Sequence, residues 1–187
     1  LWRFKVDEQL TDIDLYRKLR EKNPAPFAGI VRYKKSSIIS SSPERLISIS
    51  GDHLRTRPIA GTRPRGTSGI VDVELTKELI NSDKEKAEHL MLVDLERNDI
   101  SKVCEPGSVK VDEMMSIETY AHVHHIVSNI SGKKRKNINP GEIIKSVFPG
   151  GTITGCPKVR CMEILAELEK EGRGPYTGSF GYVTHSG

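Results

Sequence analysis

The sequence contains no apolar run near the roughly 18 residues that a membrane-spanning helix needs, and its first residues show no signal-peptide pattern. Aromatic residues are few, at 5% of the 187 residues, and there is neither an aromatic platform nor a basic stripe. The net charge of +4 arises from 29 basic and 25 acidic residues that are interspersed, which is weak evidence for a nucleic-acid partner. We therefore expect a cytoplasmic protein that binds neither a membrane nor a nucleic acid.

Cysteine is also scarce. The three cysteines are odd in number and lack the paired spacing of a metal site: Cys104, Cys156 and Cys161. This pattern excludes a disulfide framework, and we expect reduced, buried thiols.

An α+β fold with antiparallel sheets is predicted, because strands gather in blocks with helices between them. A chain of this length and apolar content can bury a single core, so we expect one domain or part of one. Two hairpins are predicted at turns 34–35 and 51–52. We predict strands at residues 1–6, 27–33, 36–41, 46–50, 54–57, 109–111, 122–131 and 176–184, and helices at residues 12–21, 75–99, 140–147 and 157–170.

Two glycine-rich stretches are candidate ligand sites, since glycine lets the backbone approach a bound group closely. In PIAGTRPRG, Thr62 offers a hydroxyl, and Arg63 and Arg65 can face a carboxylate; the alternative is an exposed basic turn. FPGGTITGCPK precedes a helix that starts near Pro157, a setting that suits anions. It lacks the ending of a P-loop, and a plain structural turn is its alternative.

Ionisable residues in weakly polar surroundings form a third group. Glu88 lies in an apolar helical segment and can bind a hard cation such as magnesium, although one glutamate alone is weak evidence. In HVHHIVS, His122 and His124 share one face of a predicted strand and His125 faces the other, which argues against a three-histidine zinc site. A structural role is the alternative for His125.

Seven motifs occur in order along the chain: SPERL, RPIAGTRPRG, AEHLMLVDLERND, CEPGSVKV, HVHHIVS, FPGGTITGCPKVRCMEI and RGPYTGSFGYV. Together they resemble catalytic component I of anthranilate synthase and of aminodeoxychorismate (para-aminobenzoate) synthase, which are chorismate-binding enzymes. The resemblance implies their α/β sandwich, with two stacked antiparallel sheets and helices outside, of whose single catalytic domain residues 1–187 would be the central part. It also implies Mg²⁺ as cofactor and ammonia from a glutamine amidotransferase subunit in a hetero-oligomer.

The same resemblance implies catalytic roles. Glu44 is similar to the acid that protonates the departing C4 hydroxyl of chorismate, a task that suits a carboxyl with a raised pKa. Thr62 and Thr152 resemble hydroxyls near the substrate. Glu88 resembles one of two glutamates that hold magnesium, which neutralises a chorismate carboxylate. His125 resembles the histidine associated with pyruvate elimination.

Substrate-binding roles follow in the same way. Ala60, Gly61 and Gly151 resemble residues that shape the floor of the site. Tyr176 resembles a residue that lines the substrate pocket, and Lys158 is placed to assist a carboxylate. None of the three cysteines is needed for catalysis, because the thiol that hydrolyses glutamine would belong to the partner.

The resemblance leaves two products open. Aminodeoxychorismate synthases typically carry lysine where this chain has Ala60, and that lysine attacks C2 so that ammonia enters at C4. Alanine offers no amine, which favours ammonia addition at C2, pyruvate loss and anthranilate, on the route to tryptophan. GGTITGCPKVRCMEI and YTGSFGY look closer to aminodeoxychorismate synthases, on the route to folate. We expect anthranilate, with aminodeoxychorismate as the alternative.

A catalytically incomplete fragment is a further alternative. Leu1 is not an initiator methionine and Gly187 directly follows a strand-like run, so we expect both ends to be cuts. The second magnesium glutamate, a substrate-binding arginine and a carboxylate-binding glycine loop of the resembled enzymes would lie beyond Gly187. Unpaired sheet edges of such a fragment would invite association.

Overall fold

The computed structural model describes residues 10–185, so the strand predicted at residues 1–6 lies outside the described part. In chain order the elements are α1 (Asp12–Lys22), β1 (Phe27–Tyr33), β2 (Ser36–Ser42), β3 (Ser48–Ser50), β4 (His53–Thr56), β5 (Ile59–Pro64), α2 (Gly69–Asn81), α3 (Asp83–Ser101), β6 (Lys110–Thr119), β7 (Val123–Lys133), α4 (Pro140–Val147), α5 (Gly151–Thr154) and α6 (Lys158–Glu169). The predicted α+β fold with two antiparallel sheets and helices is confirmed.

The larger sheet is built around β7. Strand β6 pairs with one edge of β7, and β4 and β5 pair in succession with the other edge. Strand β3 extends the sheet beyond β4. Because β4 and β5 are nearly continuous in sequence, they act as one long strand that runs antiparallel to β7 and carries the PIAGT motif along it.

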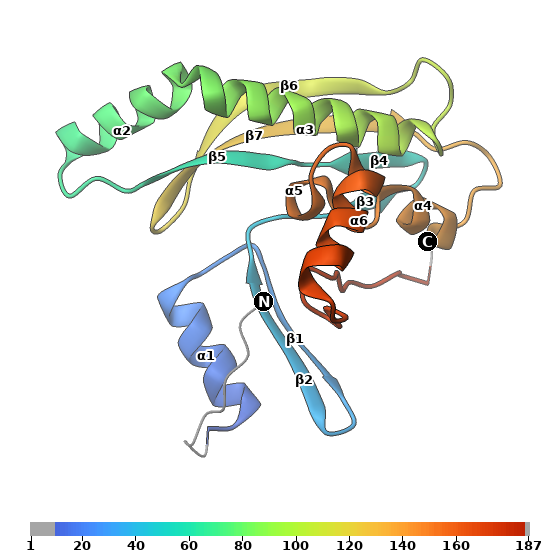
Figure 1. The fold of residues 1–187 in the computed structure, drawn as a ribbon, viewed down its shortest axis with the longest axis horizontal. Coiled ribbons are helices and arrows are strands. Elements are labelled where there is room, and N and C mark those ends of the chain that lie inside the picture. Colours follow the sequence, from blue (N-terminus) through green and yellow to red (C-terminus); the bar gives the residue numbers. More distant parts are fainter. Residues whose placement is uncertain (1–9, 186–187) are drawn as a thin grey trace.

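Helices α2 and α3 lie end to end across one face of this sheet (Figure 1). The helix predicted at residues 75–99 is therefore two helices. The chain breaks at Ser82, which has extended backbone and whose side chain accepts a hydrogen bond from the Glu85 backbone N–H, an N-cap for α3. The core lies between α3, α4 and the sheet, with these buried residues: Leu54, Val93, Ile100, Val103, Cys104, Ile130, Ile143 and Val147.

The hairpin β1–β2 forms the second sheet and extends away from the larger one together with α1 (Figure 1). Helix α1 begins after Thr11, whose side chain accepts a hydrogen bond from the Asp14 backbone N–H, and it ends one residue beyond the predicted range of 12–21. No helix among residues 10–185 is long and apolar enough to cross a membrane.

Three local predictions are wrong. The sequence predicts no strand at residues 59–64, but they form strand β5, because β7 supplies a ladder of backbone partners that no local pattern reveals. Residues 176–184 form turns and irregular structure, because no strand among the described residues pairs with this segment through a backbone ladder. Cys104 is buried as expected, whereas Cys156 is exposed and Cys161 half-buried.

Candidate active site

A β-bulge in β5 lies at the centre of the predicted site. Ile59 pairs with Val127 and Thr62 with His125, so the two residues Ala60 and Gly61 stand opposite one residue of β7. Gly61 has φ +91°, a backbone conformation that favours glycine, and a Cβ atom there would also make a tight contact of 3.0 Å with the Ile126 side chain. The bulge also decides the register, because in a regular ladder Thr62 would stand opposite His124.

Thr62 and His125 are in direct contact across the two strands. The Thr62 Oγ1 atom lies 2.9 Å from His125 Nδ1. The Tyr120 ring meets the imidazole edge-on, with ring centroids 5.7 Å apart. Burial lowers the pKa of His125, and a hydrogen bond with the Gly61 backbone opposes this shift. A half-buried imidazole with a lowered pKa is neutral near neutral pH and able to accept a proton.

Glu44 and Thr152 form a second contact, between the loop after β2 and the short helix α5. The Thr152 hydroxyl lies 3.0 Å from both carboxylate oxygens of Glu44. Burial raises the pKa of Glu44 to about 7, although the Thr152 hydroxyl and the Ile59 backbone favour the charged form. A carboxyl group that still carries its proton near neutral pH can serve as a general acid.

Both contacts adjoin the same short stretch of β5. The Ile59 backbone bonds to Glu44, and Gly61 and Thr62 contact His125. Ala60 lies between them, buried against Leu92 and Leu95 of α3. Residues 59–62 thus join the candidate acid to the candidate base.

Gly151 lets the glycine-rich loop close against α3. A Cβ atom on Gly151 would lie 2.7 Å from Leu95 Cδ2, so a larger residue would push α5 away from the helix. Four residues of the glycine-rich loop form α5, which directs Thr152 at Glu44, and binding of an anion by this loop stays a prediction.

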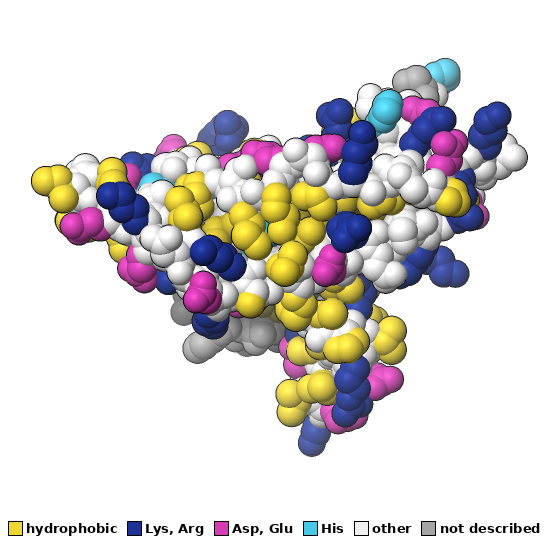
Figure 2. All heavy atoms as spheres, turned by 90° about the horizontal axis from the view of Figure 1, so that it is seen from above, with side chains coloured by type: hydrophobic (Ala, Val, Ile, Leu, Met, Phe, Trp, Pro, Cys, Tyr) yellow, Lys and Arg dark blue, Asp and Glu magenta, His cyan; other side chains and the backbone are white. Residues whose placement is uncertain are grey.

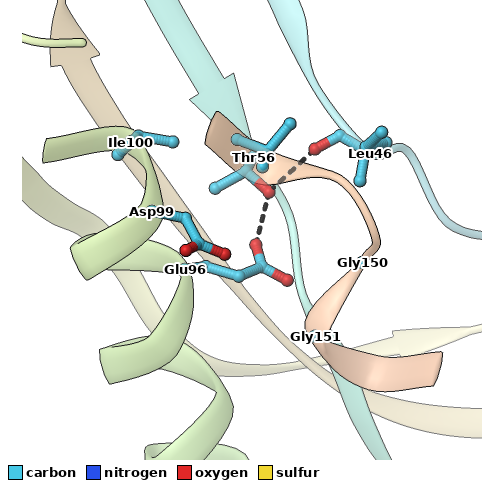
Figure 3. A pocket seen from close by; sticks show the side chains of 8 residues that line it. Leu46, Thr56, Glu96, Asp99, Ile100, Gly150 and Gly151 are labelled. Atoms are coloured by element: carbon cyan, nitrogen blue, oxygen red, sulfur yellow. Dashed lines mark hydrogen bonds between the residues drawn. The ribbon is translucent and has the colours of Figure 1, made fainter. Parts of the chain in front are cut away.

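A small cavity lies beside the loop, lined by Leu46, Thr56, Glu96, Asp99, Ile100, Val147, Gly150 and Gly151 (Figure 3). Thr56 Oγ1 lies within hydrogen-bond distance of both the Leu46 carbonyl oxygen, at 3.1 Å, and the Glu96 carboxyl. A hydroxyl has one proton and a carbonyl only accepts, so both bonds form together when Glu96 is the protonated donor to Thr56. Burial raises the pKa of Glu96 to about 8, with Glu44 and Asp99 adding to the shift.

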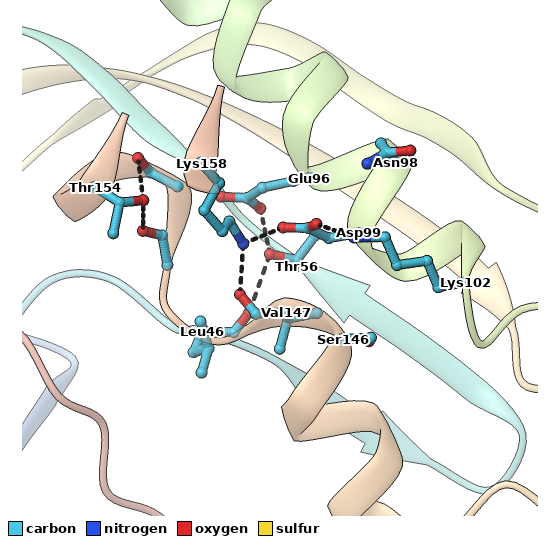
Figure 4. A network of polar contacts seen from close by, with 12 residues as sticks. Leu46, Thr56, Glu96, Asn98, Asp99, Lys102, Ser146, Val147, Thr154 and Lys158 are labelled. Carbon is cyan, nitrogen blue, oxygen red and sulfur yellow. Dashed lines mark hydrogen bonds and ion pairs between the residues drawn. The ribbon is translucent and has the colours of Figure 1, made fainter. Parts of the chain in front are cut away.

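Lys158 belongs to a buried ion pair at the same place (Figure 4). Its ammonium group bonds to the Asp99 carboxylate and, at 3.0 Å, to the Val147 carbonyl oxygen. The side chains of Lys158 and Asp99 are 14% and 4% exposed. Lys102 also contacts Asp99, at 2.9 Å. This pair fastens the start of α6 to α3 and α4.

A sequence model of the chorismate binding enzymes matches residues 2–187. The chain belongs to the chorismate-binding enzyme family. It is 54% identical over 172 residues to aminodeoxychorismate synthase component 1 of Bacillus subtilis (strain 168), covering 92% of this chain and 37% of that protein. It is 48% identical over 183 residues to the anthranilate synthase component I-like protein of Synechocystis sp., covering 98% and 38%.

Among solved structures, anthranilate synthase component I from Streptococcus pneumoniae TIGR4 matches with a TM-score of 0.86 and 37% identity, over 95% of this chain and 39% of that one. The chain therefore spans well under half the length of these relatives. They include enzymes named for both products that the sequence left open.

For a chorismate-binding enzyme, the structure brings several sequence-predicted residues together and leaves others apart. Glu44 contacts Thr152, and Thr62 contacts His125, while Ala60, Gly61 and Gly151 lie beside these pairs. Tyr176 is 48% exposed and stacks under the Arg173 guanidinium at 5.7 Å. Its place in the substrate pocket stays a prediction.

The residues predicted to bind a cation or a substrate carboxylate differ in whether other side chains of the protein already bind them. Glu88 is exposed on α3, and its carboxylate has no hydrogen-bond or ion-pair partner among residues 10–185. Arg63 pairs with Glu78 and Glu85, and Arg65 pairs with Asp72, so both arginines serve the protein's own carboxylates. Lys158 is likewise engaged by Asp99, which favours a positioning role over a substrate contact.

Sequence reasoning missed Glu96 and Asp99. Both lie in the AEHLMLVDLERND motif, in which the sequence points to Glu88 as a candidate. The missed signal was the helical period: Glu96 follows Leu92 by four residues and Asp99 follows Leu95 by four, on the face of α3 that is buried. Asp94, in contrast, is exposed and pairs only with Arg97 among the described residues.

Proposed function

We propose that the protein containing this chain aminates chorismate at C2 and eliminates pyruvate to give anthranilate. The observation that carries the choice of product is Ala60, which occupies the bulge beside Glu44 and His125 and presents only a methyl group packed on Leu92 and Leu95. No amine is available there to attack C2, so ammonia itself must form the new bond.

The first step needs an acid at the C4 hydroxyl. Glu44, with a pKa raised to about 7 by burial, donates its proton so that the C4–O bond breaks and water leaves. Ammonia bonds to C2 as the ring double bonds shift toward C4, and it then loses a proton. Thr152 keeps the carboxyl oriented through its hydroxyl.

The second step needs a base at the C2 proton. His125 is neutral because burial lowers its pKa, and Thr62 orients it from β5. Removal of the C2 proton breaks the C3–O bond, the enolpyruvyl methylene takes up a proton, and pyruvate leaves as the ring becomes aromatic. Thr62→Val should therefore slow this step more than the first.

Magnesium is proposed to bind at Glu88. Among residues 10–185, no group of three or more histidine, cysteine, aspartate or glutamate side chains is arranged to hold a metal. A single unpartnered carboxylate nevertheless fits magnesium, which commonly takes one or two protein carboxylates plus water and substrate oxygens. Bound there, the ion would neutralise a substrate carboxylate. Glu88→Gln should raise the magnesium concentration needed for half-maximal rate by about tenfold or more.

A glutamine amidotransferase subunit is proposed as the source of ammonia. The relatives are named component 1 or component I, which supports a partner component. No cysteine lies among the residues of the Glu44–Thr152 and Thr62–His125 contacts, so this chain supplies no thiol there for glutamine hydrolysis. The rate with glutamine should depend on the partner, and the rate with ammonium salts should not.

The second candidate is C4 amination to aminodeoxychorismate, which the 54% identity to the B. subtilis enzyme favours. The test is to incubate the full-length protein with chorismate, magnesium and ammonium at alkaline pH and to resolve the products by chromatography while following fluorescence. Anthranilate supports the proposal. Formation of aminodeoxychorismate without anthranilate would show that Ala60 does not direct ammonia to C2.

A further inference from the structure

His89 of α3 is fully buried beneath the sheet, and both of its ring nitrogens are hydrogen-bonded. Nδ1 lies 3.1 Å from the Ala60 carbonyl oxygen in the bulge, and Nε2 lies 2.7 Å from Ser128 Oγ in β7. The histidine therefore links α3 to both strands that carry the Thr62–His125 contact. No role in the proposed reaction uses it.

The partners of His89 fix its tautomer. The Ala60 carbonyl can only accept, so Nδ1 carries the proton. Ser128 Oγ lies 2.7 Å from Nε2 and 3.6 Å from Met114 Sδ, so its single proton is donated to Nε2. Ser128 Oγ in turn accepts from the Met115 backbone N–H at 2.9 Å. A chain of three hydrogen bonds thus runs from β6 through β7 and α3 to the bulge, with a fixed direction.

The bulge is the place where β5 needs such an anchor. An extra residue in one strand has no ladder partner, and a buried carbonyl left unpaired costs about 1–3 kcal/mol. Ala60 directs its carbonyl to His89 instead. If this anchor were lost, β5 could slide by one residue, which would bring Gly61 opposite His125 and Thr62 opposite His124.

We propose that His89 is a positioning residue whose Nδ1–H holds the Ala60 carbonyl and thereby keeps Thr62 opposite His125. The proposal rests on the proposed function for the step that it affects. Because the Thr62–His125 pair is assigned to pyruvate elimination, loss of the anchor should slow elimination more than amination. The aminated intermediate should then accumulate.

Three substitutions in the full-length protein separate the anchor from simple packing. The amide nitrogen of Asn in His89→Asn occupies the place of Nδ1 and can still donate to Ala60, while the Ser128 hydroxyl turns to Met114 Sδ, 3.6 Å away. The amide of His89→Gln reaches toward Ser128 instead, and His89→Leu donates to neither. We expect the elimination rate of His89→Asn to stay within about fivefold of the wild-type rate. The elimination rates of His89→Gln and His89→Leu should fall about 100-fold.

The readout is the ratio of aminated intermediate to anthranilate, resolved by chromatography over a time course. His89→Leu should raise this ratio, as should Thr62→Val, and the double variant should be no worse than the poorer single one. If His89→Leu does not fold, His89→Gln carries the same test. Equal losses in both steps, or equal losses for Asn and Leu, would overturn the proposal and leave His89 a core residue.

A failure of the proposed function can be distinguished from a failure of the His89 proposal. If wild type releases aminodeoxychorismate and no anthranilate, the ratio is uninformative, and chorismate consumption becomes the readout, with Asn expected to rescue and Leu and Gln not. In ¹⁵N-histidine NMR spectra of the wild type, His89 should appear as the neutral Nδ1–H tautomer. A Nε2–H tautomer would overturn the proposal whichever product is made.

Discussion

The hydroxyl of Thr152 should tune the acidity of Glu44, and removing it should move the alkaline limb of the pH–rate profile. Glu44 acts while protonated, so the rate is constant below its pKa and falls about tenfold per unit above it. Burial raises that pKa from 4.5 to about 7, and the Thr152 hydroxyl lowers it. In Thr152→Val only the burial and the Ile59 backbone contact remain, so the pKa of Glu44 should rise further.

The size of the shift follows from the contact. The Thr152 hydroxyl lies 3.0 Å from both oxygens of Glu44, and a hydrogen bond to a charged group contributes about 1.5–3 kcal/mol. One pKa unit corresponds to about 1.4 kcal/mol, so the limb should move from near pH 7 upward by about one to two units. The total rate should fall as well, because the carboxyl loses its orientation.

The assay is kcat against pH with chorismate saturating and with un-ionised ammonia held at one concentration throughout. Thr154→Val is the matched control, since Thr154 lies in the same short helix and donates to the Gly150 carbonyl oxygen, at 2.8 Å, rather than to Glu44. The control should keep the wild-type limb. A limb that stays in place in Thr152→Val, or that moves to lower pH, would refute the role of Glu44 as the acid.

Three further predictions concern the buried charges and the loop. The folded state holds the Glu96 proton up to about pH 8, while the unfolded chain releases it near 4.5, so wild type loses stability as pH rises across that window. Glu96→Gln should lose less, because of these two buried carboxyls Glu44 alone, with its pKa raised to about 7, then contributes; urea unfolding at several pH values checks this, and an equal loss in the variant would contradict a raised pKa of Glu96. Lys158→Met should cost about 3 kcal/mol in unfolding free energy, because Asp99 then keeps Lys102, whose side chain is 53% exposed, as its cationic partner. Adding Asp99→Asn should restore part of this cost; a double variant no more stable than the single one would contradict a buried pair. Gly151→Ala should cost about 1–3 kcal/mol through the clash with Leu95, measured by urea unfolding, and less in a Leu95→Ala background; equal costs in both backgrounds would rule out the clash.

The sequence predicted the helices and strands that are determined by the residues within and next to them. The hairpin β1–β2, helix α1 and helix α4 have the bounds, or nearly the bounds, that turn residues and apolar period predicted. The break at Ser82 had a signal, a serine followed three residues later by Glu85, but the apolar period continued through it and concealed it. Strand β5 had no local signal because its cause is β7, some 60 residues later.

The candidate site could be named from motifs but not assembled from them. Glu44 and Thr152 are separated by 108 residues, and only the fold brings them into contact. Glu96 escaped notice because only the helical period, and no motif, places this carboxyl on the buried face of α3. Its raised pKa comes mainly from burial, with Asp99 of the same helix adding to the shift and Thr56 of β4 opposing it.

The bulge in β5 also bears on how enzymes of this kind diverge. A residue inside a regular ladder is constrained by cross-strand partners on both sides, whereas Ala60 occupies the one irregular step of β5 and its backbone is held from α3. A change of side chain there leaves the pairing of the sheet untouched and needs only space beside Leu92 and Leu95. Under the proposed function, the position that separates direct from lysine-assisted amination is thus one where the side chain can be changed without altering the sheet pairing, which makes it the natural first site for engineering product choice.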